Sequence, residues 1–404
     1  MELLAEATQH LHEGRPDLAL PLAKHALSVS QHPNNESLTA TASLPALTLL
    51  AEINLELGNP DTARDFFLQA VSLDPDGGVP DHRGGGAEKF LQLAQLCEER
   101  GAESVEWFER GVSILRTRIA ALLDSNENRG EGDAGDEEMR ALKRKLASAL
   151  CGIVEVYMTD LSWEVDAEAR CETLVTEALM ESPNDPIPLQ TLASVRISQG
   201  RIPEAQKALS ESMEIWMDGE EDRGQDSALA QDISADDGAG VGEESNLTPD
   251  FPTRISLARL LMEVSLEEAA LSVVERLVQE DDESVEAWYL GGWCLYLLGE
   301  KQTSGPKPNG DAIPDGNGGD ELRIASLVSS REWLRQSLAL YERVEYEDVR
   351  LREHVVELVG ELDGLLEGVE VEGQEEGGEG DEGWESEEGE GEGVDGDVEM
   401  GDGG

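Results

Sequence analysis

The 404-residue chain has few aromatic residues, only 4% of the total, and few cations, with 30 Lys and Arg against 88 Asp and Glu. The net charge of −58 argues against direct binding to nucleic acid, because phosphate contacts depend on Lys and Arg. It also argues against docking on anionic membranes. Since apolar residues still make up 39%, most of the chain can fold, but its core must be built from Leu, Ala and Val.

Cysteines are also few and scattered. Cys97, Cys151, Cys171 and Cys294 form no C-x-x-C pair, so we expect reduced, buried thiols and not a disulfide framework. No apolar run approaches the ~18–20 residues that a membrane span requires, and the first residues lack the basic region of a signal peptide. These absences predict a protein of the cell interior without a membrane anchor.

Patterns that carry catalysis or metal binding are missing as well. The six histidines make no metal-spaced pair with the cysteines, and no Ser/His/Asp arrangement or phosphate loop can be proposed. Gly391, Gly393 and Gly396 match a dinucleotide-binding pattern, but no strand precedes them and no helix follows. We therefore expect no enzyme activity, no cofactor and no metal.

Acidic residues concentrate in two segments. Residues 367–404 hold 17 acids, 13 glycines and no Lys or Arg, and residues 218–247 hold ten acids and one Arg. Such compositions cannot bury enough apolar surface to order the chain, so both segments are predicted to be disordered. The rest still carries −32, which makes the folded body acidic in its own right.

Weaker breaks divide the remaining chain. Residues 125–138 and 302–320 are rich in Gly, Asn or Pro and are predicted to be flexible loops, and 76–86 is a shorter break of the same kind. The expected organisation is a helical part over residues 1–217, the acidic insertion 218–247, a second helical part over 248–366, and the acidic tail 367–404.

Between the breaks the pattern is helical, with almost no strand-like alternation, so the chain is predicted to be all-α. A ladder of small and apolar residues recurs at fixed spacing on either side of a short turn. Its occurrences are Ala51, Ala63, Phe67, Ala70 and Pro75; Ala193, Ala205, Leu209 and Ser212; Ala258, Ala270, Val274 and Leu277; and, more weakly, Ala7, Ala19, Ala23 and Ala26. Small residues at this spacing let two antiparallel helices approach closely.

This ladder resembles the tetratricopeptide repeat, a helix pair of about 34 residues. About seven such pairs fit between Met1 and about Glu345. A last helix over residues 346–366 has the pattern of a cap, with apolar positions at Val349, Val356, Val359, Leu362 and Leu366. The resemblance implies a right-handed superhelix in which the first helix of each pair lines a concave groove.

The exposed side of these first helices supplies candidate partner-binding residues. They are Glu52, Glu56, Gln95, Glu98, Glu99, Glu155, Arg259, Glu263, Tyr289, Trp293 and Tyr296. Acids with a few aromatics suit Arg and Lys side chains, through ion pairs and cation–π contacts. The alternative is that they are ordinary solvated helix faces.

Two other readings bear on the partner. Leu4, Thr8, Leu49, Glu88 and Gln92 occupy the places where heat-shock adaptors of this repeat class grip an acidic peptide, and none would hold a carboxylate. The one basic cluster, at residues 140–145, is either the solvated start of a helix or an import signal.

The order of segments over residues 1–366, with residues 49–58 and 66–75 in particular, is similar to fungal dedicated assembly chaperones of large-subunit ribosomal protein four. That resemblance implies a monomer that binds the long, basic internal loop of the newly made ribosomal protein. It further implies an escort role from cytoplasm to nucleus, with a nuclear import receptor as a second candidate partner. A histone or general basic-protein chaperone, or a scaffold in another complex, remains the alternative.

Overall fold

The structure is a computed structural model that describes residues 2–30, 40–97, 101–126, 133–227, 248–304 and 318–367. Within these ranges every regular element is a helix, which confirms the all-α prediction. The α-helices are α1 (Glu2–His12), α2 (Pro16–Ser30), α3 (Leu44–Glu56), α4 (Pro60–Leu73), α5 (Glu88–Gln95), α6 (Ala102–Asn126), α7 (Asp133–Met158), α8 (Ala167–Glu181), α9 (Pro186–Ser198), α10 (Ile202–Ser227), α11 (Phe251–Glu263), α12 (Glu267–Glu280), α13 (Val285–Ser304), α14 (Gly318–Arg343) and α15 (Val349–Leu365). Two short 3-10 helices, η1 (Ala40–Ser43) and η2 (Asp81–Arg83), precede α3 and α5.

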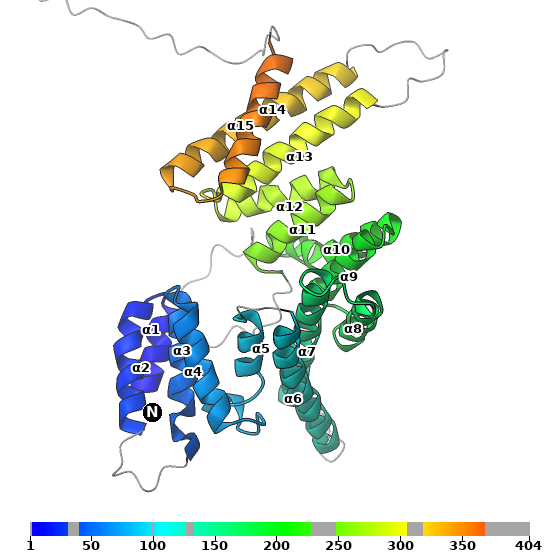
Figure 1. Cartoon of the computed structure of the whole chain (residues 1–404). Coiled ribbons are helices and arrows are strands. Elements are labelled where there is room, and N and C mark those ends of the chain that lie inside the picture. The colour runs from blue at the N-terminus through cyan, green and yellow to red at the C-terminus, as the bar shows by residue number, and fades with distance from the viewer. Residues whose placement is uncertain are drawn as a thin grey trace, which may run out of the picture.

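The helices pair in chain order. α1 packs on α2, α3 on α4, and so on to α13 on α14, and α15 then packs on α14 and α13. Figure 1 shows these pairs stacked along an elongated molecule, with α1 and α2 at one end and α15 at the other. The described part thus contains the seven pairs and the final helix that the sequence predicts.

The small residues of the ladder lie where paired helices meet. Ala51, Ala63 and Ala70 have no exposed surface, and Phe67 is 1% exposed in the space beside them. The corresponding residues of α9–α10 and α11–α12 are equally buried. A larger side chain at these positions would hold the helix axes apart, so the ladder fixes the close approach within each pair.

Turns within four of the pairs share one backbone conformation. Gly14, Gly58 and Gly200 each adopt a positive φ, between 67° and 71°, directly after the first helix. Ser265 occupies the same place between α11 and α12 with a φ of 64°, a conformation that costs a non-glycine residue about 1–2 kcal/mol. The amide of Leu266 donates to the Leu261 carbonyl at 2.8 Å, as a tight helix-ending turn requires.

The break at residues 76–86 is packed against the stack. Lys89, at the start of α5, is 1% exposed, and its Nζ lies 2.8 Å from Asp74 Oδ2 and 2.9 Å from the Gly86 carbonyl. The other oxygen of Asp74 accepts a hydrogen bond from the Val79 amide at 3.2 Å. The segment therefore ties the end of α4 to the start of α5, although its Gly and Pro content predicts only a break.

Helices extend further into the predicted breaks than expected. α6 ends at Asn126 and α7 begins at Asp133, inside the loop predicted at 125–138. α10 continues to Ser227, into the insertion predicted at 218–247, and α13 and α14 likewise enter 302–320. Glu, Asp and Gln can prolong a helix that packing has already nucleated, so composition alone made these helices too short. The remaining parts of these breaks, and the tail from residue 368, lie outside the described residues.

The final helix has a different buried face from the one predicted. It begins at Val349, where the Asp348 side chain accepts hydrogen bonds from the first amides. Leu351, Val355, Leu358, Leu362 and Leu366 are buried, whereas Val349 and Val356 are 59% and 49% exposed. The predicted stripe was wrong at Val349 and Val356, because the adjacent apolar residues Val355 and Val356 allow two registers and the structure buries the one through Leu351 and Val355.

Candidate functional site

First helices of neighbouring pairs pack on one another at most steps of the stack. α1 packs against α3, α7 against α9, α9 against α11, α11 against α13, and α13 against α15. Between successive second helices, the described ranges contain no comparable packing. In a curved stack the layer whose members touch is the concave one. We call the surface formed by the exposed side chains of the odd-numbered helices the inner face.

Three adjacent helices bring charged side chains together on the inner face. Lys145 Nζ, from α7, lies 2.5 Å from Glu88 Oε2 on α5. Gln92, one turn further along α5, donates from Nε2 to Glu88 Oε1 at 2.9 Å. Glu52 of α3 interacts electrostatically with both Glu88 and Lys145. The inner faces of α3, α5 and α7 thus form one continuous surface.

The two carboxylates on this surface are in different electrostatic states. Although the side chain of Glu52 reaches solvent, desolvation by the surrounding helices raises its pKa and the Glu88 carboxylate raises it further, whereas His12 and Lys145 lower it by less. Burial would also raise the pKa of Glu88, but Lys145 and the hydrogen bond from Gln92 outweigh it, so the pKa of Glu88 is lowered. Within the described residues no cation lies at ion-pair distance from Glu52. Glu52 is therefore a carboxylate that a cation from outside would stabilise.

Other predicted residues of the first four pairs are exposed. Glu56 lies one turn after Glu52 on α3, Gln95 lies at the end of α5, and Glu155 lies on the solvent side of α7. The predicted Glu98 and Glu99 fall outside the described residues. Glu88 and Lys145 complete the surface, and the only sequence signals for them were a repeat-register comparison and a basic cluster.

Further along the stack, one predicted cation is already paired. Arg259 on α11 forms an ion pair with Glu286 on α13, and Glu263, one turn after Arg259, is exposed. The Arg259 guanidinium thus neutralises an inner-face carboxylate. This part of the surface stays acidic through Glu263.

Of the three predicted aromatic residues, Tyr289 is buried, whereas Trp293 and Tyr296 are partly exposed. Tyr289 is only 9% exposed, and its hydroxyl lies 2.8 Å from His354 Nδ1 on α15. Trp293 packs edge-on against the same imidazole at 5.0 Å between ring centroids. Tyr296 is half-buried and donates its hydroxyl to Glu361 at 2.9 Å. The final helix thus contacts all three side chains.

Burial also changes the pKa values of Tyr289 and Tyr296. Burial raises the pKa of Tyr289 to about 12, despite the nearby Arg259. Burial and the Glu361 carboxylate raise the pKa of Tyr296 to about 12 as well. Both hydroxyls therefore remain protonated at neutral pH, and their hydrogen bonds join α13 to α15.

The basic cluster on α7 is paired at every member. Arg140 and Arg144 pair with Glu137, Lys143 with Glu181, and Lys145 with Glu88, at distances of 2.5–3.4 Å. The pairs of Lys143 and Lys145 link α7 to α8 and α5, whereas those of Arg140 and Arg144 lie within α7, and an import signal stays a prediction.

Neither a metal site nor a membrane helix emerges from the described ranges. No group of three or more His, Cys, Asp or Glu side chains there is placed to hold a metal. None of the described helices is both long and apolar enough to cross a membrane.

Comparison with known proteins identifies the repeat and the family. The tetratricopeptide repeat family matches residues 44–76, which are α3, α4 and the turn between them. A probable assembly chaperone of rpl4 from Emericella nidulans is 45% identical over 95% of this chain and 87% of its own length. The chain belongs to the family of Rpl4 assembly chaperones. The probable assembly chaperone of rpl4 from Schizosaccharomyces pombe is 31% identical over 90% of each chain.

A solved Rpl4 assembly chaperone has the same fold. The structure of an assembly chaperone of RpL4, residues 1–338, is 46% identical, with a TM-score of 0.60 over 75% of this chain and 98% of that chain. Rpl4 assembly chaperones are not enzymes, which confirms the expectation that this chain has no catalytic activity. The expected family and its helix-pair architecture are likewise confirmed.

Proposed function

We propose that this chain is an assembly chaperone of ribosomal protein L4 and that its inner face holds a basic segment of that protein. The relatives named as chaperones of rpl4 cover nearly the whole chain, which supports the choice of client. The finer proposal is that the bound segment is the client's long internal loop, and that the complex forms in the cytoplasm and enters the nucleus.

One observation carries the binding mode. Glu52 is a partly desolvated carboxylate on the inner face with a raised pKa and no ion-pair partner in the described part of the chain. A Lys or Arg from a client at ion-pair distance would favour the charged form of this carboxylate. Exposed Glu56, Glu155 and Glu263 extend the acidic surface along α3, α7 and α11.

The charge of the whole chain supports the same mode. A net charge of −58 attracts a cationic client and repels polyanions over long range. Exposed charge pairs are screened within about 8 Å at physiological salt, so the client is held by contacts that remain exchangeable. Ribosomal RNA, a denser polyanion, can then displace the chaperone at assembly.

Charge reversal tests the inner face. Glu52, Glu56 and Glu155 are changed together to Lys, and the affinity for purified L4 is measured at low and high salt. We expect a loss of at least about tenfold, or about 1.4 kcal/mol, and a shallower salt dependence. The matched control reverses Asp65, Glu106 and Glu275, which are exposed on the second helices α4, α6 and α12, and changes the net charge equally.

The outcomes distinguish binding at the inner face from a general effect of the net charge. Equal losses for the two triple variants would show that only net charge matters and would refute the inner-face mode. Histones assayed in parallel address the alternative: histones bound as tightly as L4 would indicate a general chaperone of basic proteins.

A further inference from the structure

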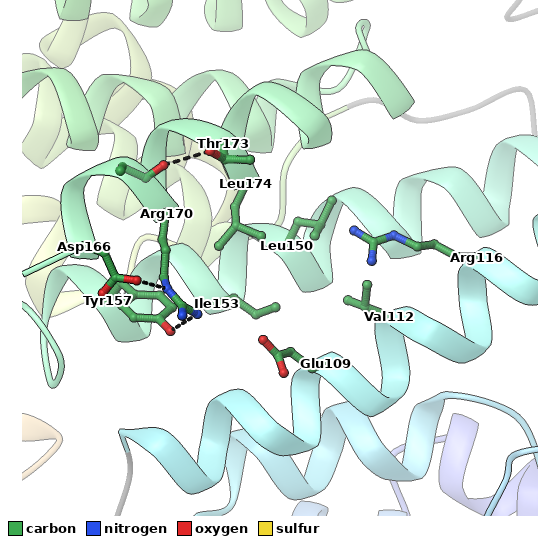
Figure 2. Close-up of a pocket in the computed structure, with 11 residues that line it drawn as sticks. Glu109, Val112, Arg116, Leu150, Ile153, Tyr157, Asp166, Arg170, Thr173 and Leu174 are labelled. Atoms are coloured by element: carbon green, nitrogen blue, oxygen red, sulfur yellow. Dashed lines mark hydrogen bonds and ion pairs between the residues drawn. The ribbon is translucent and has the colours of Figure 1, made fainter. Parts of the chain in front are cut away.

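A second surface lies on the outer side of the stack. α6 and α8 are second helices, and together with α7 they line a half-open cavity of about 490 Å³. This volume lies within the range of about 300–1,000 Å³ that binding sites for small groups occupy. Figure 2 shows its side chains converging from the three helices. We call it the outer cavity.

The outer cavity has an apolar floor and a charged rim. Val112 of α6 and Leu150 and Ile153 of α7 form the floor, and half-buried Leu174 of α8 closes one side. The floor can accept an apolar side chain. The polar rim residues are Glu109, Arg116, Tyr157, Asp166, Arg170 and Thr173.

The two cations of the rim, Arg116 and Arg170, already have ion-pair partners. Arg170 lies 2.7 Å from Asp166 Oδ2 and donates to the Tyr157 hydroxyl at 2.7 Å. Arg116 pairs with Glu177 at 2.5 Å. An anionic ligand would have to break these pairs, so the rim disfavours one.

Glu109 differs from these two rim cations in its ion pairing. Its carboxylate faces the cavity from α6 (Figure 2), and no cation of the described residues lies at ion-pair distance from it. It acts electrostatically on Tyr157 and Arg170 across the cavity. The site therefore favours a ligand that carries a positive charge next to an apolar group.

Exposed apolar side chains also occur in the turn between α7 and α8. Trp163 and Val165, in the turn just before Asp166, are 76% and 105% exposed. The Trp163 indole donates to the Asp160 carbonyl at 3.1 Å, which holds the ring on the outside of the protein. An exposed Trp close in sequence to a lining residue, here Asp166, is consistent with a protein-binding surface, where aromatic residues are enriched.

We propose that the outer cavity binds a short segment of the L4 client in which a large apolar side chain is next to a Lys or Arg. This inference rests on the proposed function for the identity of the client, and on charge complementarity for the segment. The apolar side chain occupies the floor, the cation pairs with Glu109, and flanking residues contact Trp163.

Binding on both faces has a kinetic consequence. Once the inner face holds one segment of the client, the outer cavity meets its own segment at a high effective concentration. Each contact can then be weak and exchangeable while the whole client stays bound.

The experiment uses the full-length protein and overlapping peptides that cover L4, with binding measured by fluorescence anisotropy. Glu109→Lys repels a cationic segment, and Ala169→Trp fills the cavity from an exposed position on α8. Glu106→Lys is the control, because Glu106 is exposed on the same helix outside the cavity lining. Circular dichroism checks that each variant is folded.

We expect at least one peptide with adjacent apolar and basic residues to lose tenfold or more in affinity with Glu109→Lys and with Ala169→Trp. That peptide should bind the Glu106→Lys control and the inner-face triple variant as it binds the unaltered protein. If no peptide distinguishes the two cavity variants from the control while intact L4 still binds, the outer site is refuted and the proposed function stands. If intact L4 does not bind the unaltered protein, both the outer site and the proposed function are refuted.

Discussion

Removing one member of the buried ion pair between Lys89 and Asp74 should destabilise the region that carries Glu88. Lys89→Met leaves the Asp74 carboxylate, which is 5% exposed, with only the Val79 amide as a donor. An uncompensated buried charge of this kind costs about 3–5 kcal/mol. Asp74→Asn should cost less, because burial already lowers the pKa of Lys89 and the ammonium can lose its proton when Asp74 no longer opposes that shift.

The double variant tests whether the pair itself is responsible. With both charges removed, the loss should be smaller than the sum of the single losses by about 1–3 kcal/mol. Urea denaturation followed by circular dichroism measures the free energy of unfolding.

Hydrogen exchange locates the change. A stack of helix pairs responds locally, so amides of α4 and α5 should exchange faster while those of α11–α15 are unaffected. Single variants that lose less than about 1 kcal/mol, or a uniform rise in exchange along the chain, would contradict the reasoning.

Two further predictions concern a turn and an inner-face carboxylate. Ser265→Gly should raise stability by about 1 kcal/mol, because φ is 64° there, and Gly200→Ser should lower it comparably; urea midpoints that move in the same direction would refute this. Since the pKa of Glu52 is raised by burial and by Glu88, its charge is lost at a higher pH than that of an ordinary glutamate as the solution is acidified. Calorimetric affinity for L4 should therefore fall early on acidification, and Glu52→Gln should remove that part of the pH dependence; superimposable curves would contradict it.

Features that depend on short sequence distances could be predicted. Ala51, Ala63, Phe67 and Ala70 lie within one repeat, so their spacing alone identified the helix pair and its close contact. The exposed acids of α3 followed from the same register, because helical periodicity decides which side chains point away from the partner helix. The amino-acid pattern was therefore sufficient for the fold class and for part of the inner face.

Contacts between distant residues could not be predicted. Lys145 reaches Glu88 across 57 positions, and His354 reaches Tyr289 across 65. These pairings depend on how successive helix pairs rotate relative to one another, which the periodicity of a single helix does not encode. The same limitation applies to Tyr289, Trp293 and Tyr296. Their helical register predicts that they lie on the solvent side of α13, whereas in the structure they contact α15.

The pairing of neighbouring helices also bears on how this protein is made. Described helices pack mainly against those next to them, or next but one, along the chain. Contacts of such short range form quickly and need little of the downstream sequence. A hairpin emerging from the ribosome can therefore reach its final shape as soon as the following hairpin is synthesised. The amino-terminal pairs can be complete while the carboxyl-terminal pairs are still being translated.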